Sequence, residues 1–118
     1  MKKIFLLLVL PFISSFAFAE CKTSNVYVEI ACYEKELKSN KTKLNQTYQK
    51  LYNTMDEEGK KILETAQKNW LFYKNSHCDE LVSYLSSGVQ GAGSKLINLS
   101  CNADLTDQRI KQLNQLEE

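Results

Sequence analysis

The sequence predicts an all-α protein: an antiparallel pair of long helices plus a short C-terminal helix, stapled by two disulfides. Three observations carry this prediction. Apolar residues recur every three or four positions in two long stretches, a short polar segment separates the stretches, and four cysteines follow an N-terminal export signal. Long amphipathic helices joined by so short a connection must lie antiparallel, and we expect each to cover the apolar face of the other.

The N-terminal residues have the layout of a secretory signal peptide. Lys2 and Lys3 form a basic start, residues 4–16 are mainly apolar, and Ala17-Phe18-Ala19 gives the small-x-small pattern of a cleavage site. We therefore expect a signal peptide at residues 1–19 and a single domain at residues 20–118.

A cleaved signal places the protein in the periplasm or outside the cell. The apolar run is too short to span a membrane and ends in a cleavage site, so no stable membrane insertion is expected after signal removal. A lipid anchor on Cys21 is the alternative. Acylation there needs a small residue just before the cysteine, and Glu20 is not one.

Charge and composition exclude several classes of function. The chain has 15 basic and 14 acidic residues, and loss of Lys2 and Lys3 leaves 13 against 14, so nucleic acid is not an expected partner. No Cys-x-x-Cys occurs and His77 is the only histidine, so we expect no metal site and no cofactor. No group of residues has the pattern of a catalytic site, which predicts a protein that is not an enzyme.

Two apolar stripes define the long helices. The first helix is expected at about residues 25–55, on the stripe Ile30, Tyr33, Leu37, Leu44, Tyr48, Leu51 and Met55. Thr54 and Glu57 have the spacing of a capping box, so the second helix should run from about 57 to 86. Its stripe is Leu63, Ala66, Trp70, Tyr73, His77, Leu81 and Tyr84.

The rest of the chain is expected to form a loop and a final helix. Residues 86–94 contain three of the four glycines and predict a flexible loop. Beyond Cys101, Thr106 is expected to cap a short helix whose stripe continues through Leu113 to the C-terminus.

Four cysteines allow three pairings. Cys32 with Cys78 is attractive because both lie about 23 residues from a turn near residue 55, at similar heights in a helical hairpin. Cys32 is well off the Leu37, Leu44 and Leu51 stripe, however, so it need not face the second helix. We favour Cys21 with Cys32, which requires an irregular first turn, and Cys78 with Cys101, which would clamp the glycine loop at its base.

Several short motifs follow one another in a fixed order along the chain: Cys32, Leu44-Asn45-x-x-Tyr48, Gln67-x-x-Trp70-x-x-Tyr73, Cys78, Cys101 and Thr106-x-x-Arg109-x-x-x-Leu113. This order resembles the N-terminal domain of the lysozyme inhibitor LprI family. The resemblance implies a small, helical, exported bacterial protein. It also implies a protein partner, with lysozyme as the candidate.

The chain departs from the family pattern at two places. Lys74-Asn75 stands where family members commonly have Arg-Asp, and Asn40-Lys41 stands where a small residue and Asp are frequent. These changes remove an ion pair that the family pattern would place in a buried or half-buried position.

The residues of the family pattern, from Leu44 and Asn45 to Thr106, Arg109 and Leu113, are expected to be structural core residues. Leu44, Tyr48, Trp70 and Tyr73 share the helical period of the apolar stripes, so we place them in the core rather than in a ligand site. Asn45 and Gln67 are expected to bond each other or a helix backbone across the interface.

The glycine-rich loop is the candidate partner-binding element. Its members are Ser87, Gly88, Val89, Gln90, Gly91, Ala92 and Gly93. The leading hypothesis is a non-enzymatic protein that binds and blocks a lysozyme (muramidase) stoichiometrically. The alternative is a structural or adaptor module of the bacterial cell envelope that binds another envelope protein. The oligomeric state is not predicted by the sequence.

Overall fold

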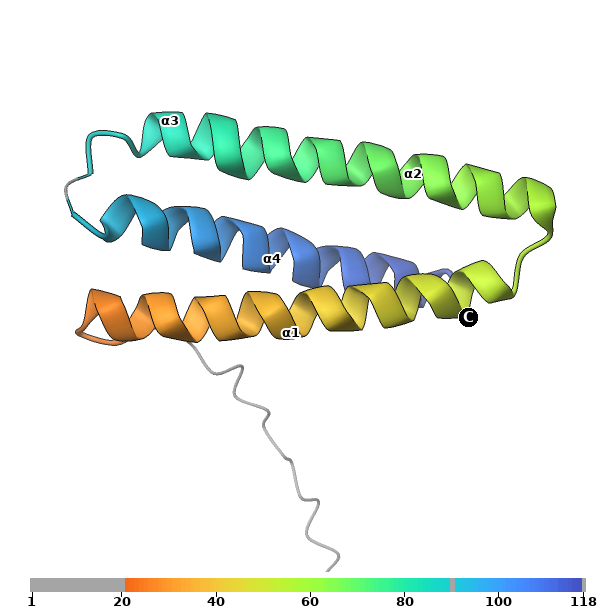
Figure 1. Cartoon of the computed structure of the whole chain (residues 1–118), viewed down its shortest axis with the longest axis horizontal. Helices are drawn as coiled ribbons and strands as arrows, with labels where there is room; N and C mark the ends of the chain where they lie inside the picture. The colour runs from red at the N-terminus through yellow and green to blue at the C-terminus, as the bar shows by residue number, and fades with distance from the viewer. Residues whose placement is uncertain (1–20, 90, 118) are drawn as a thin grey trace, which may run out of the picture.

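A computed structural model of the chain describes residues 21–89 and 91–117. These residues form three helical rods and contain no strand (Figure 1). The first rod is α1 (Val26–Asn53), and the third is α4 (Gly93–Gln115). The second rod is continuous through α2 (Glu57–Asn75), the π-helical segment η1 (Ser76–Val82) and α3 (Ser83–Leu85). The predicted all-α class is confirmed.

Both favoured disulfides are present. Asn25 caps α1 because its side chain accepts from the backbone N–H groups of Tyr27 and Val28. Cys21 therefore lies before the helix, in an irregular segment that returns to Cys32 with a Cα–Cα distance of 5.5 Å. Cys78 and Cys101 form the second bond with a Cα–Cα distance of 5.6 Å. The alternative pairing of Cys32 with Cys78 is wrong.

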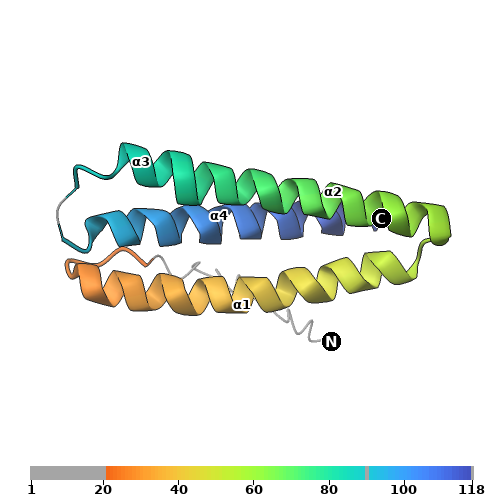
Figure 2. The same ribbon diagram turned by 45° about the horizontal axis from the view of Figure 1, so that its top comes forward.

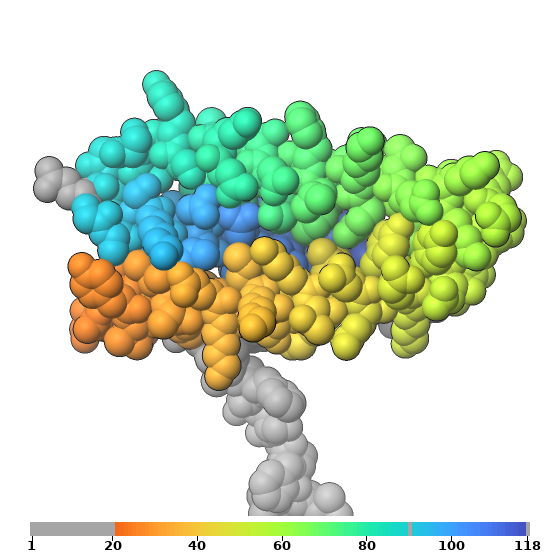
Figure 3. Space-filling model, in the orientation of Figure 1, coloured from red at the N-terminus to blue at the C-terminus, as the bar shows by residue number. Residues whose placement is uncertain are grey.

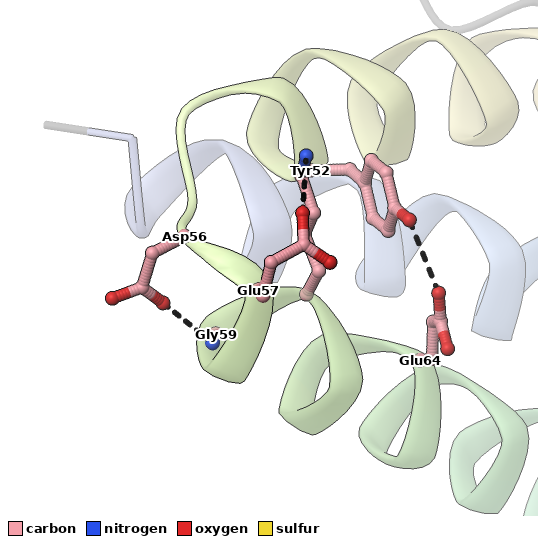
Figure 4. A network of polar contacts seen from close by, with 6 residues as sticks. Tyr52, Asp56, Glu57, Gly59 and Glu64 are labelled. Atoms are coloured by element: carbon pink, nitrogen blue, oxygen red, sulfur yellow. Dashed lines mark hydrogen bonds and ion pairs between the residues drawn. The ribbon is translucent and has the colours of Figure 1, made fainter.

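The turn between the first two rods is capped by Asp56 rather than by Thr54. Oδ1 of Asp56 accepts from the Gly59 N–H at 2.8 Å (Figure 4). Oγ1 of Thr54 donates instead to the Leu51 carbonyl at 2.7 Å, at the end of α1. The hydroxyl of Tyr52 donates to Oε1 of Glu64 at 3.2 Å. These contacts place the start of α2 against the end of α1.

The order of packing differs from the expected helical pair. Figures 1 and 2 both show α4 between α1 and the second rod, and α1 makes its main contacts with α4. α1 and α2 approach each other closely only near their connecting turn, so the prediction that each covers the apolar face of the other is wrong. In the space-filling view α4 is visible at the bottom of the groove that this arrangement leaves (Figure 3).

The C-terminal helix is longer than expected. α4 begins at Gly93, so Thr106 lies in its interior, where Oγ1 donates to the Asn102 carbonyl at 2.7 Å. Thr106 is therefore a buried residue whose hydroxyl bonds to a carbonyl one turn earlier in the helix, and it is not the expected helix cap.

The apolar core lies toward the turn end of the molecule, where all three rods meet. Its fully covered members are Leu44, Leu51, Leu63 and Leu113. Half-buried residues surround them: Tyr48, Tyr52, Met55, Trp70 and Ile110. Toward the other end of the molecule the buried groups include Asn40, Lys74, Ser86 and Asn102 beside Ile30 and Ala103, so polar contacts and both disulfides contribute to holding that half.

The stripe predicted for the second helix faces largely outward. Tyr73, Leu81 and Tyr84 are all more than half exposed, and Ala66 is exposed too. Within the predicted stripe Leu63 is buried, and Trp70 and His77 are half-buried. The other buried positions along this rod and at its end are Lys74, Cys78 and Ser86. The prediction that the aromatic stripe forms the inter-helix core is therefore wrong for most of its length.

Candidate partner-binding loop and its support

The candidate loop begins from an anchored base at the end of α3. Ser86 is buried, and its hydroxyl lies 3.3 Å from the Ser83 carbonyl and 3.5 Å from Oγ of Ser94 across the loop. The Val89 N–H donates to the Ser86 carbonyl at 2.9 Å, which forms a turn immediately after this base. The two ends of the loop are thereby held side by side.

The tip of the loop is shaped by glycine at two positions. Gly91 has a φ of +67°, in the left-handed region where a side chain is disfavoured. A Cβ on Gly93 would lie 2.6 Å from Cγ1 of Val89, so glycine is needed there for Val89 to fold back onto the start of α4. Gly88 has no neighbour within 4 Å of its Cβ position and is exposed. Gln90 lies outside the described residues.

A polar cluster supports the loop from below. Nδ2 of Asn98 lies 3.2 Å from the Cys78 carbonyl and 2.9 Å from Oδ1 of Asp79. Oγ of Ser83 donates to the same Cys78 carbonyl at 3.1 Å. The wider π-turns of η1 rearrange the usual carbonyl bonding, and these side chains satisfy the carbonyl at the point where the disulfide crosses to α4.

Asn102 extends this cluster to a buried cation. Its Nδ2 donates to Oδ1 of Asp79 at 3.0 Å, and its Oδ1 accepts from Nζ of Lys74 at 2.7 Å. Hydrogen bonds from Asn102 and Asn98 lower the pKa of the Asp79 carboxyl. Burial lowers the pKa of Lys74, an effect that Asp79 opposes. The cluster thus holds η1 against α4, because the side-chain amide of Asn102 bonds both charged residues, Lys74 and Asp79.

Three residues of the family pattern meet beside the apolar core. Nε of Arg109 on α4 donates to Oε1 of Gln67 on α2 at 3.0 Å. The guanidinium of Arg109 also lies over the Trp70 ring, 5.9 Å from its centroid. Gln67 therefore bonds Arg109, and the three side chains form a half-buried contact between α2 and α4.

The remaining family residues divide between core and surface. Leu44, Thr106 and Leu113 are buried, and Tyr48 is half-buried, as expected for core positions. Asn45 and Tyr73 are exposed, so the core prediction is wrong for both, and Asn45 does not bond Gln67. Tyr73 instead stacks on His77, with ring centroids 5.7 Å apart.

The second rod carries an exposed apolar surface, and three of its members, Tyr73, Leu81 and Tyr84, belong to the stripe that was predicted to be core. We define the outer apolar face as Ile62, Phe72, Tyr73, Leu81, Tyr84 and Leu85, each more than half exposed. Its C-terminal part leads directly into the candidate loop, where Val89 is also exposed. An exposed apolar surface of this extent is typical of protein–protein contact.

The described residues offer no site for a metal and no membrane span. Among residues 21–89 and 91–117, no three His, Cys, Asp or Glu side chains lie together in a way that could hold a metal ion. None of the helices in the same residues has the length and apolar character needed to cross a lipid bilayer.

Comparison with known proteins identifies the family. The sequence model of the family "Lysozyme inhibitor LprI" matches residues 20–113. The chain belongs to the LprI family. Searches of curated proteins and of solved structures find no match to this chain. The matched range includes both disulfides and the whole candidate loop, so the family assignment applies to the complete helical assembly.

Another arrangement around Lys74 replaces the ion pair of the family pattern in this chain. Burial lowers the pKa of Lys74, and the positive charge of Lys41 on α1 lowers it further. The buried cation of this chain is satisfied by Asn102 and by the field of Asp79 instead. The pairing of Lys74 with Asn102 has no local signature in the sequence, because 28 residues separate the two.

Proposed function

We propose that the chain is an exported, non-enzymatic protein that binds a lysozyme stoichiometrically and blocks it. The family match over residues 20–113 carries this proposal. It begins at residue 20, directly after the expected cleavage site, which supports a signal peptide at residues 1–19 and action in the periplasm or outside the cell. Two disulfides support the same location, because such bonds persist in oxidising compartments.

The loop from Ser87 to Gly93 is the contact element of this proposal. It carries no charged residue, and Gly88 and Gly91 are exposed. A lysozyme must keep its cleft open to a polysaccharide, so a protruding loop of small residues could enter that cleft and exclude the substrate by volume. The Cys78–Cys101 bond holds both ends of the segment, which reduces the conformational entropy lost on binding.

A titration tests the inhibitor proposal. The oxidised chain without residues 1–19 is added in increasing amounts to lysozyme acting on peptidoglycan. Stoichiometric blocking gives a lysis rate that falls linearly and ends near one inhibitor per enzyme. An unchanged rate at large molar excess would defeat the proposal and leave the adaptor module of the cell envelope as the remaining interpretation.

Two valine variants test the loop itself. Val89 in the loop and Val28 on α1 are similarly exposed, at 44% and 52%. Val89→Asp should weaken inhibition at least tenfold, because it places a charge where the loop would enter an enclosed cleft. Val28→Asp should inhibit like the parent chain. Equal inhibition by both folded variants, or by a folded variant shortened between Gly88 and Gly93, would remove the loop from the contact.

A further inference from the structure

The outer apolar face is not explained by the loop proposal. Its six side chains extend over most of the second rod, whereas the buried side of that rod includes the polar residues Lys74 and Ser86. Large apolar side chains are thus more numerous among the exposed positions of this rod than among its buried ones. A helix with an apolar stripe on its solvent side has a second packing surface, which a further helix can cover.

The π-helical segment aligns the two halves of this face. In an unbroken α-helix, Tyr84 would lie about 120° around the axis from Phe72, because each residue turns by about 100°. A π-turn takes more residues than an α-turn, so the seven residues of η1 rotate the later side chains back toward the earlier ones. This rotation brings Tyr84 back to the side of Phe72. It likewise brings Leu81 to the side of Tyr73.

We propose that a second copy of this chain covers the outer apolar face, through antiparallel pairing of the two second rods about a two-fold axis near Phe72. Ile62 lies ten residues before Phe72 and Leu81 nine residues after it. In an antiparallel pair centred there, Ile62 of each copy meets Leu81 of the other, while the two Phe72 rings meet at the axis. A two-fold dimer buries the same surface on both copies. The nearly equal spacing of Ile62 and Leu81 from Phe72 lets each of them meet the other across the axis.

The size of the face fits such a dimer. The six side chains are between 51% and 76% exposed. Since a covered aromatic side chain buries about 150–250 Å², the set offers roughly 700 Å² of apolar surface. A stable interface needs about 800 Å² from each partner, which the polar neighbours of the stripe complete. The length and straightness of the stripe match another helix of equal length.

Charge at the edge of the face agrees with antiparallel pairing. Lys61 directly precedes Ile62, and Glu80 directly precedes Leu81, so both exposed side chains lie along the same edge. A two-fold axis between antiparallel helices brings equal edges together, which sets Lys61 of one copy beside Glu80 of the other.

The test is the mass of the oxidised chain without residues 1–19, measured by sedimentation equilibrium across micromolar concentrations. We expect a dimer. Phe72→Glu and Leu81→Glu should weaken dimerisation at least tenfold, with helix content by circular dichroism unchanged. Tyr27→Glu and Leu116→Glu are the matched controls, because Tyr27 is as exposed as Phe72 (73% and 74%) and Leu116 is an exposed leucine elsewhere; both should stay dimeric.

A cross-link tests the register. Phe72→Cys should form a disulfide between two copies on mild oxidation, and Tyr27→Cys should not. A parent chain that stays monomeric throughout the concentration range would overturn the proposal. So would equal dissociation of the test and control variants. If Phe72→Glu abolished lysozyme inhibition while the parent chain was monomeric, the face would belong to the enzyme contact and not to a second copy.

Discussion

Nζ of Lys74 donates a 2.7 Å hydrogen bond to Oδ1 of Asn102, and both side chains are buried. The amide of Asn102 bonds Asp79 from its other end at 3.0 Å. A single neutral side chain therefore connects a buried ammonium group to the carboxylate of η1, and it fastens the second rod to α4 below the loop.

Loss of this amide should destabilise the fold. Asn102→Ala leaves the Lys74 ammonium buried without its closest acceptor, so we expect the free energy of unfolding to fall by about 2 kcal/mol or more. Urea denaturation of the oxidised protein measures the change. Asn45→Ala is the control because Asn45 is an exposed asparagine on α1, and its variant should unfold like the parent. Equal effects from both substitutions would contradict a special role for Asn102.

Replacement of Lys41 by an acid should stabilise the protein. Lys41 lowers the pKa of Lys74 through like-charge repulsion. Lys41→Asp exchanges this repulsion for attraction and restores an acid where the family pattern frequently has one, so we expect a gain of about 0.5–1 kcal/mol. The gain should shrink in 1 M salt. Lys38→Asp places the same charge change at another exposed position of α1, and it should give no comparable gain.

Asp79 should contribute stability that depends on pH. Hydrogen bonds from Asn102 and Asn98 lower its pKa in the folded protein, so the folded state binds this proton less readily than the unfolded chain. The stabilisation is complete above about pH 4, the value typical of a free Asp, and is lost as the pH falls through the lowered folded pKa. Asp79→Asn should therefore unfold more easily than the parent by about 1 kcal/mol at pH 7, and the gap should close near pH 2.

Urea denaturation of the parent and Asp79→Asn at pH 7, 4 and 2 measures this gap. Glu80→Gln changes the neighbouring exposed carboxylate and should show no such closing. A gap that stayed constant from pH 7 to pH 2 would rule out the carboxylate as its origin.

Both disulfides should stabilise the fold, but only Cys78–Cys101 should be needed for lysozyme inhibition. Removal of Cys78–Cys101 by paired Cys→Ser substitution should cost about 3 kcal/mol, by the chain-entropy relation for a loop of this length, and should weaken lysozyme inhibition. Removal of Cys21–Cys32 should cost slightly less and leave inhibition intact, since that bond ties only the N-terminal segment to α1. Thermal unfolding and the lysis assay measure the two effects. Similar inhibition by both variants would contradict the assignment.

Glycine should be required at one loop position and dispensable at another. Gly91→Ala forces a side chain into the left-handed region, so we expect a loss of about 1 kcal/mol or a displaced loop. Gly88→Ala adds a methyl group where no atom lies within 4 Å, so it should be neutral. Differential scanning calorimetry of the pair checks the difference. A neutral Gly91→Ala would show that the loop does not hold this conformation.

The helices and disulfides were predictable because their signals are local. Apolar periodicity defined α1 and the second rod, and the position of Cys21 before the helix cap allowed its bond to Cys32. The length of α4 was not predictable by the same route, because Ser94, Asn98 and Ser100 interrupt its apolar pattern. Asn98 is tolerated because its side chain bonds across to η1, whereas the hydroxyl of Ser100 donates to the Ile97 carbonyl of its own helix.

Which residues of the second rod face inward was not predictable from the sequence, for a related reason. Periodicity finds where apolar residues gather, and in this rod they gather on the solvent side. The inward positions include Gln67 and Lys74, which are stabilised by Arg109 and Asn102 on α4. Such pairs have no signature in a single sequence, because their members are separated by 42 and 28 residues.

The Cys78–Cys101 bond closes a covalent ring around the loop. Exposed glycine-rich tips are preferred sites of proteolysis. A protease that cut between Gly88 and Gly93 would release no fragment, because the bond keeps the two halves joined. The nicked protein would migrate as one species without reductant and as two with it. The second rod and α4 would stay tethered in place, so damage at the most accessible segment would leave the molecule whole.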